Sequence, residues 1–218
     1  MSTRIIIFAK APVAGLAKTR LIPALGADGA ARLAQQMLLS TLNASLNANI
    51  GPVELCMSPG PNAIEWRHVP LPAGIELSDQ GDGDLGCRMA RATRRCLVDN
   101  RHPNEPVLLI GTDCPQLSPV LLERAAERLA DHDALLHPTM DGGYALIGLH
   151  RFHTSLFEHM PWSTERVATL TLERIMQQGW RCAVGERLQD IDEPNDLFWL
   201  PSVWARLLPH STKVDHDV

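Results

Sequence analysis

Short apolar runs alternate along this chain with longer segments in which apolar residues recur every three to five positions. Residues 4–9, apolar from Ile5 onward, and residues 107–110 form two such runs, which are typical of strands buried on both faces. The spacing of apolar residues over 33–46 instead predicts one buried face of a helix. The same criteria predict a loop over 10–25, strands at 53–57, 75–77, 134–137, 144–149 and 181–184, and helices at 84–97, from 119, at 164–178 and from 195.

The alternation of strands with helices predicts an α/β fold in which a mostly parallel, mixed sheet is covered by helices on both faces. We found no repeat or linker, so we expect one three-layer α/β/α domain over residues 1–209 and a flexible tail over 210–218. Ligands of such folds bind beyond the carboxyl ends of the strands. We therefore expect the functional residues directly after residues 9 and 110 and in the loops near residues 141 and 190.

Composition excludes several classes of partner. The chain has 218 residues and a formal net charge of −5, which argues against binding to nucleic acid or to an anionic membrane surface. Its longest apolar runs have about five residues, whereas a membrane-spanning helix needs about 20. The N-terminal run ends at Lys10, too early for a secretory signal, and the five cysteines are scattered. We expect a cytoplasmic protein with reduced thiols.

The loop after the first strand carries three cations, Lys10, Lys18 and Arg20, together with Gly15. Phosphate is bound by fixed cations, and a glycine lets the backbone approach a ligand, so the loop is a candidate anion site. A solvated basic loop is the alternative. The loop is not a P-loop, because that motif needs a glycine directly before the lysine and Ala17 stands there.

A carboxylate, Asp113, follows the second buried strand directly after Thr112. Mg²⁺ is commonly bound by one or two carboxylates together with substrate phosphates. Asp113 could instead cap the next helix, but Ser118 is better placed for that role because it immediately precedes Pro119. The position therefore favours metal binding.

Two further carboxylates, Asp190 and Asp192, alternate in an extended segment and would face the same way. Two like charges held together are unfavourable unless a cation separates them, so both are candidate metal ligands. Asp192 could alternatively cap the helix expected from residue 195, and Asp196 fits a structural role in its first turn.

Three glycine- or aromatic-containing segments complete the candidate site. Around Gly81, Asp84 and Arg88 a glycine-rich loop enters a helix; we expect it to contact ribose or base, with Arg88 on a phosphate. A tight turn is the simple interpretation of residues 141–144, although paired glycines could also let a substrate lie against the backbone. The candidate substrate-binding residues are Gly142, Gly143, Trp162 and Ser163, with burial of the tryptophan and helix capping by the serine as the alternatives.

Taken together, these segments resemble the bacterial family of radical-SAM/selenodomain-associated glycosyltransferases, which are similar to nucleotide-diphospho-sugar transferases of the glycosyltransferase-A type. The matching motifs run in order across nearly the whole chain, at residues 8–12, 15, 18–21, 80–81, 84–86, 88–89, 110–115, 141–144, 161–164 and 190–194. More distantly, the sequence resembles guanylyltransferases that activate phospholactate or phosphoenolpyruvate, through residues 18–21, 113 and 190–192.

The resemblance implies a glycosyltransferase-A-like, Rossmann-like fold and a site that uses Mg²⁺ or Mn²⁺. It implies that the metal is bound by three aspartates, Asp113, Asp190 and Asp192, and that phosphate is contacted by Lys10, Lys18 and Arg20. Many nucleotide-sugar glycosyltransferases carry Asp-x-Asp after the central strand, but this chain has a single carboxylate there.

The sequence thus favours a metal-dependent transferase that uses a nucleotide substrate, with Lys18, Arg20 and Asp113 as catalytic residues. The cation-rich loop fits a triphosphate, whose pyrophosphate leaving group needs neutralising, so we favour nucleotidyl transfer to a small acidic or phosphorylated acceptor. Glycosyl transfer from a nucleotide-sugar is the alternative reaction, and a non-catalytic nucleotide sensor is the alternative class. The expected nucleotide-binding residues are Lys10, Gly15, Lys18, Arg20, Gly81, Asp84, Arg88 and Thr112.

Overall fold

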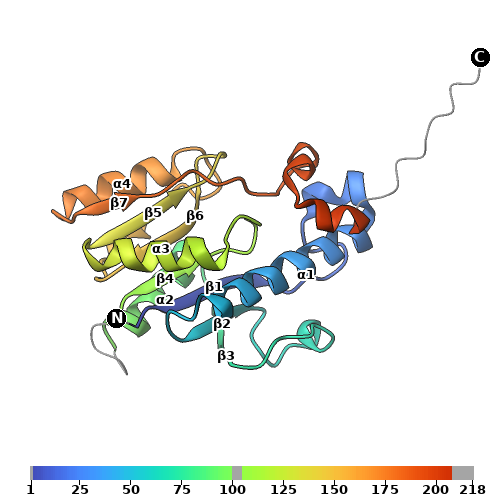
Figure 1. Cartoon of the computed structure of the whole chain (residues 1–218), viewed down its shortest axis with the longest axis horizontal. Helices are drawn as coiled ribbons and strands as arrows, with labels where there is room; N and C mark the ends of the chain where they lie inside the picture. The colour runs from blue at the N-terminus through green and yellow to red at the C-terminus, as the bar shows by residue number, and fades with distance from the viewer. Residues whose placement is uncertain (1, 100–104, 208–218) are drawn as a thin grey trace, which may run out of the picture.

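One seven-stranded sheet organises the molecule. The computed structural model describes residues 2–99 and 105–207 (Figure 1). The sheet has the order β3-β2-β1-β4-β6-β5-β7, and β6 runs antiparallel to its neighbours β4 and β5. The carboxyl ends of the other strands therefore meet at the edge of the sheet where β6 begins. The strands are β1 Arg4–Lys10, β2 Val53–Ser58, β3 Ile75–Asp79, β4 Val107–Ile110, β5 Ala134–Pro138, β6 Tyr144–Leu149 and β7 Cys182–Val184.

Strand β1 lies inside the sheet, next to the central strand β4, and pairs in parallel with β2 on one side and with β4 on the other. The chain lays down β2 and β3 to one side of β1, and then crosses to the other side to form β4. Such a reversal opens a crevice outside the carboxyl ends of the two central strands, here at Lys10 and Ile110. This crevice is where the predicted site residues of β1 and β4 come together.

Two helices cover each face of the sheet. Core residues of α1 (Ile22–Ala48) and α3 (Pro119–Ala130) pack with one set of strand side chains, and those of α2 (Leu85–Leu97) and α4 (Val167–Gln177) pack with the opposite set. Alternate residues of a strand face opposite ways, so Ile5 and Ile7 of β1 join the first core and Ile6 joins the second. The predicted three-layer α/β/α architecture is confirmed.

Side-chain caps begin two helices, and one of them, Ser118, was predicted from the sequence. Asp84 caps α2 by accepting a hydrogen bond from the Cys87 amide at 2.8 Å, and Ser118 caps α3 by accepting one from the Leu121 amide at 3.2 Å. Ser118, rather than Asp113, therefore satisfies the amides of α3. Asp113 is left available to the crevice.

Two helix boundaries differ from the prediction. The fourth helix begins at Val167 rather than at 164, and Ser163 does not cap it, because its backbone is in the left-handed region at φ 63°. The first helix begins at Ile22, inside the predicted loop, and is kinked at Gly26, whose φ of 70° only glycine adopts readily. No helix within the described ranges is both long and apolar enough to cross a membrane.

The last described segments pack against the beginning of α1 (Figure 1). The helix predicted from 195 is two 3-10 helices, Pro194–Trp199 and Ser202–Leu207. Buried Ile191 and Trp204 join a small core with Leu21 and Leu33. This packing holds the loop that carries Asp190 and Asp192 close to the cationic loop after β1. The predicted tail, 210–218, lies outside the described residues.

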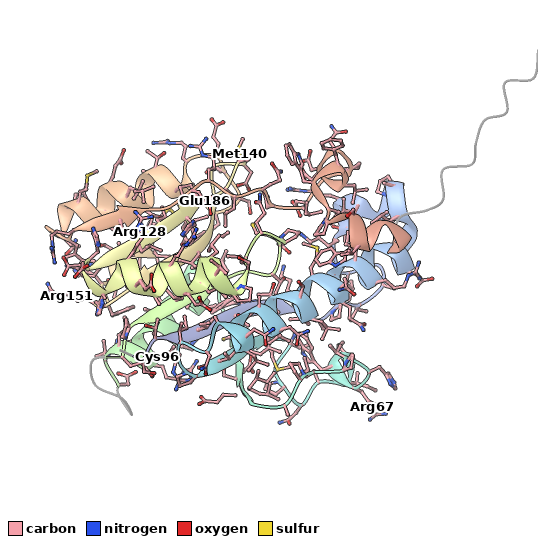
Figure 2. All side chains as sticks on the ribbon, viewed as in Figure 1. Arg67, Cys96, Arg128, Met140, Arg151 and Glu186 are labelled. Atoms are coloured by element: carbon pink, nitrogen blue, oxygen red, sulfur yellow. The ribbon has the colours of Figure 1, made fainter. Side chains whose placement is uncertain are left out.

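A set of charged and polar side chains surrounds the buried carboxylate of Glu54 under α2 and is here called the Glu54 network: Arg4, Glu54, Glu76, Ser78 and Arg95. Glu54 has a 1% exposed side chain, which accepts hydrogen bonds from Arg95 Nη2 and Ser78 Oγ, each at 2.5 Å. Arg4 Nη1 lies 3.6 Å from the same carboxylate and 2.7 Å from Glu76. The hydrogen bond to Glu54 raises the pKa of Arg95, so every charge in the network is paired. In Figure 2 the Glu54 network can be located by the label of Cys96, the residue that follows Arg95 on α2.

Candidate functional site

A cavity of about 550 Å³ opens at the carboxyl edge of the sheet, a size typical of small-molecule sites. Its floor is formed by the ends of β1 and β4, one wall by the cationic loop and α1, and the opposite wall by the start of β6 and the segment before α4. The residues predicted from sequence that line it are Lys10, Lys18, Arg20, Thr112, Asp113, Gly143, Trp162, Ser163 and Asp192.

Four charged residues make up what is here called the Lys18 cluster: Lys18, Arg20, Asp113 and Asp192. Lys18 Nζ lies 2.8 Å from Asp113 Oδ1 and 3.6 Å from Asp192 Oδ1, and Arg20 Nη1 lies 2.5 Å from Asp192 Oδ2. The exposed fractions of the side chains are 8% for Lys18 but 62%, 52% and 37% for Arg20, Asp113 and Asp192. The cluster is thus open to the cavity while its lysine is buried beneath it.

Backbone contacts hold the two halves of the Lys18 cluster together although they are far apart in sequence. The Ile191 amide donates to the Asp113 carbonyl at 2.9 Å, and Lys18 Nζ donates to the Ile191 carbonyl at 2.6 Å. Ile191 itself is fully buried in the core beside α1. These contacts place three predicted segments, 18–20, 113 and 190–192, at one point.

The donor set of the Lys18 cluster fits a hard divalent cation. The carboxylates of Asp113 and Asp192 converge on one ammonium group, and both stay partly exposed to the cavity. Within residues 2–99 and 105–207, no three histidine, cysteine or acidic side chains are arranged as a ready-made metal cage. Mg²⁺ seldom uses such a cage; it is usually bound through one or two carboxylates, substrate phosphates and water. The residues present fit that mode of binding.

Asp190 lies behind the cavity rather than on its surface. Its side chain is half-buried, and it is absent from the cavity lining formed by the described residues. Burial, reinforced by the neighbouring charges of Asp141, Asp196 and Asp192, raises the pKa of Asp190 to about 6. The expectation that Asp190 and Asp192 face one way into the cavity is therefore wrong: Asp192 reaches the cavity, and Asp190 lies deeper among carboxylates.

Asp141 is a site residue that the sequence analysis passed over as part of a turn. Met140 is exposed at the periphery of the molecule (Figure 2). The next residue, Asp141, lines the cavity. Its carboxylate accepts hydrogen bonds from Thr139 Oγ1 at 2.5 Å and from the Gly143 amide at 2.8 Å. The turn belongs to the site because β6 is antiparallel, which brings the β5–β6 connection to the same edge as Lys10. In the sequence, Asp141 was marked by its place in a turn near a strand end and by the match of residues 141–144 to the resembled family.

The glycine-rich loop reaches the cavity through residues other than those predicted. Gln80, Leu85 and Met89 line it, whereas Gly81, Asp84 and Arg88 do not. The Arg88 guanidinium donates instead to the Gly83 carbonyl at 2.8 Å and to Ser58 Oγ at 3.3 Å, and Asp84 caps α2. These three residues, predicted to contact the nucleotide, lie outside the cavity lining, and their polar groups form hydrogen bonds within the loop itself.

Gly15 has a φ of 80° and shapes the cationic loop without lining the cavity. The cationic loop needs a glycine at this position for its turn rather than for contact with a ligand. The backbone alone therefore accounts for its presence.

Gly142 and Gly143 have different roles. Gly142 has a φ of 90°, and a Cβ there would collide with the backbone of Glu165, so this glycine permits close packing of two chain segments. It lies outside the main cavity, whereas Gly143 lines it. Of the two glycines predicted to face a substrate, Gly143 alone lies on the lining of this cavity.

Trp162 and Tyr144 meet edge to face on one wall of the cavity, with ring centroids 6.4 Å apart. Both side chains are half-buried. Trp162 thus combines burial with a surface toward the cavity, where an aromatic face can contact a base, a sugar or an apolar group.

Cys114, next to Asp113, is a buried thiol. Burial raises the pKa of Cys114 above its usual range, and the nearby carboxylates of Asp113 and Asp190 raise it further. The thiol therefore remains protonated and is unsuited to nucleophilic catalysis. The polar chemistry of the site rests on its cations and carboxylates.

Comparison with known proteins agrees with this architecture. Residues 41–164, more than half of the chain, match the family described as "Uncharacterized protein conserved in bacteria (DUF2064)". No curated protein sequence matches the chain. A candidate nucleotide-diphospho-sugar transferase from Desulfovibrio desulfuricans G20 is 28% identical, with a TM-score of 0.83 over 94% of this chain and 88% of that protein. The predicted nucleotide-diphospho-sugar transferase fold is confirmed.

Two more distant structures share the fold. Rv0371c from Mycobacterium tuberculosis H37Rv, solved in complex with manganese, is 14% identical, with a TM-score of 0.56 over 95% of this chain and 98% of that one. A CMP:2-keto-3-deoxy-manno-octonic acid synthetase, solved with CTP, is 12% identical, with a TM-score of 0.57 over 95% of this chain and all of that one. The structural neighbours of this chain include transferases that use nucleotides.

Proposed function

This chain belongs to the family "Uncharacterized protein conserved in bacteria (DUF2064)", and from the geometry of its cavity we propose that it is a divalent-metal-dependent transferase with a nucleotide substrate. The favoured reaction is nucleotidyl transfer from a nucleoside triphosphate to a small acidic or phosphorylated acceptor. One observation carries the proposal: three cations meet the accessible carboxylates of Asp113 and Asp192 in one cavity at the carboxyl ends of β1 and β4. A phosphate chain and a metal ion need that combination.

Each charged residue has a task in this reaction. Lys10, Lys18 and Arg20 would hold the phosphates, and Lys18 and Arg20 would stabilise the charge that develops on the pyrophosphate leaving group. Asp113 and Asp192, with Asp190 behind them, would hold the divalent ion, which supplies neutralisation of the phosphate oxygens when bound. Positioning and electrostatics would then provide most of the rate enhancement.

The opposite wall would receive the acceptor and the nucleoside. Gln80, Leu85 and Met89 border the cavity on the α2 side, and Trp162, Ser163 and Gly143 border it near α4. The mixture of apolar and hydrogen-bonding groups suits a base or sugar on one side and a small polar acceptor on the other.

Glycosyl transfer from a nucleotide-diphospho-sugar is the second candidate function. It is favoured by the likeness to the candidate nucleotide-diphospho-sugar transferase from Desulfovibrio desulfuricans G20. The single carboxylate after β4, where many such enzymes carry two, supports nucleotidyl transfer instead. The two reactions differ in their leaving group, so products distinguish them.

A donor screen tests the proposal. The protein is first examined by thermal shift with nucleoside triphosphates and nucleotide-sugars, with and without Mg²⁺ or Mn²⁺; a ligand at 100 times its Kd adds about 2.7 kcal/mol of stability. The donors that bind are then incubated with phospholactate, phosphoenolpyruvate and simple sugar acceptors. Pyrophosphate release from a triphosphate supports nucleotidyl transfer, and nucleoside diphosphate release from a nucleotide-sugar supports glycosyl transfer. Binding without turnover of any donor would point to a nucleotide sensor.

A further inference from the structure

Lys18 presents its ammonium group to the oxygens that a divalent cation would use. Nζ lies 2.8 Å from Asp113 Oδ1 and 3.6 Å from Asp192 Oδ1, and it donates to the Ile191 carbonyl at 2.6 Å. Carboxylate and carbonyl oxygens are the ligand types that Mg²⁺ and Mn²⁺ prefer. With a side chain only 8% exposed, Lys18 is enclosed by these groups rather than solvated beside them. Its ammonium is a stand-in for a bound cation.

The backbone holds Lys18 in this position. Its φ of 48° and ψ of 46° lie in the left-handed region, which costs a residue with a side chain roughly 1 kcal/mol or more. The conformation is maintained because the next turn, Thr19–Leu21, is anchored by Leu21, which is fully buried in the core beside α1. The fold therefore accepts a small strain at the residue that places the ammonium between the carboxylates.

This arrangement directs two of the three cavity cations away from an incoming phosphate. Lys18 pairs with Asp113 and Asp192, and Arg20 pairs with Asp192. A triphosphate needs those cations free, whereas a metal ion needs those carboxylates free. A single exchange meets both requirements: the metal ion takes the carboxylates as the lysine moves to the phosphate.

We propose that Lys18 is an internal counter-cation that competes with the divalent ion for Asp113 and Asp192 and is released onto the nucleotide phosphates when both ligands bind. This inference rests on the proposed function of the same cavity. It makes the binding of metal and of nucleotide mutually reinforcing, because each ligand removes the obstacle to the other, and such coupling is reciprocal. Lys18 thereby acts as a positioning residue before it contacts the substrate.

The test is the affinity for Mn²⁺ alone, measured by calorimetry on the full chain. Lys18→Met keeps the apolar stem and removes the charge, so we expect it to bind Mn²⁺ about tenfold more tightly than the wild type, a gain of about 1.4 kcal/mol. When the Mn²⁺ titration is repeated with GTP or CTP present, and free Mn²⁺ is corrected for binding to the nucleotide, the Mn²⁺ affinity of the wild type should rise more than that of the variant. The difference should be about the same tenfold factor.

Two further variants control the measurement. Lys18→Gln keeps a polar end without charge and should bind Mn²⁺ as Lys18→Met does. Agreement between the two variants means that the result does not depend on a folding defect of either one. Thermal melts verify that each variant is folded. Lys10→Met removes an exposed cation from the same loop and should leave the affinity for Mn²⁺ alone within about twofold of the wild type.

The inference is overturned if folded Lys18→Met and Lys18→Gln bind Mn²⁺ no more tightly than the wild type. It is also overturned if Lys10→Met tightens binding equally, because the effect would then be general electrostatics. Failure of the proposed function looks different: Mn²⁺ binding would follow the expected order while no donor is consumed by the wild type. The metal titration and the donor screen therefore report separately.

Discussion

The Glu54 network and the Lys18 cluster are built from the same chemistry, two cationic side chains converging on carboxylates, but they lie in different surroundings. In the Glu54 network the central carboxylate is 1% exposed and sits on a sheet face beneath α2. In the Lys18 cluster the two carboxylates are 52% and 37% exposed and sit at the edge where the strands end. Only the second set of charges can exchange partners with a ligand.

The contrast lies in what each charge costs to leave unpaired. A buried charge that loses its partner keeps its desolvation penalty, so the Glu54 network can only be structural. A partly exposed charge is stabilised by water when its partner leaves. The exposed charges of the Lys18 cluster therefore add little to stability and can exchange their ion-pair partners for a ligand. Mutations in the two regions should therefore separate function from stability.

The largest effect is expected at Asp113. Asp113→Ala should lower metal-dependent turnover of the nucleotide donor roughly a thousandfold, equivalent to about 4 kcal/mol, because it removes a carboxylate that holds the divalent ion. The free energy of unfolding, from urea titration without metal, should change by less than about 1 kcal/mol, since Asp113 is half exposed. Glu173→Ala, an exposed carboxylate on α4, is the control. Full activity of a folded Asp113→Ala protein would contradict the assignment.

Glu54 should show the opposite behaviour. Glu54→Ala removes the buried carboxylate to which Arg95 and Ser78 donate and beside which Arg4 is buried, and it should lower the free energy of unfolding by about 3 kcal/mol. Donor affinity at a temperature where the variant is folded should not change. Glu76→Ala removes a 60% exposed carboxylate from the same network and should cost less than about 1 kcal/mol. Equal losses from the two variants would mean that burial is not what distinguishes the two regions.

Asp190 is intermediate between the two regions, being half-buried with a pKa raised from 3.8 to about 6. The folded state retains the Asp190 proton to higher pH than the unfolded state does, so stability falls as pH rises from about 4 to about 6. Asp190→Asn removes that loss and should raise the free energy of unfolding at pH 8 by roughly 1 kcal/mol, after allowance for solvent screening, but not at pH 4. Melts in chelator at both pH values measure the difference. A gain that is the same at both would exclude titration of Asp190 as its cause.

The smallest effect on stability is expected from Arg20. Its ion pair with Asp192 is short, at 2.5 Å, but the guanidinium is 62% exposed. Arg20→Met should therefore change the free energy of unfolding by less than about 0.5 kcal/mol in chemical denaturation. A loss close to that of Glu54→Ala would show that the Lys18 cluster is structural after all.

Much of the fold could be predicted from local sequence. The apolar runs at 107–110 and 144–149 became β4 and β6 with unchanged bounds, and Asp84 and Ser118 cap the helices that follow them. Apolar periodicity and capping act over a few residues, so these features are encoded where they occur. Ser163 does not cap α4, because the helix begins only at Val167 and Ser163 itself has a left-handed backbone. The residues between them include Glu165, whose backbone packs against Gly142.

By itself, the sequence determined the alternation of strands and helices and the placement of Lys18, Arg20, Asp113 and Asp192 after the ends of strands. Only the tertiary structure decided the direction of β6, which brings Asp141 into the cavity, and the pairing of Arg88 with the Gly83 carbonyl rather than with the cavity. It alone placed the Lys18 ammonium between two carboxylates, one of them 174 residues away. Strand ends follow from local pattern, but which side chains meet there depends on strand order and long-range packing, which no local pattern encodes.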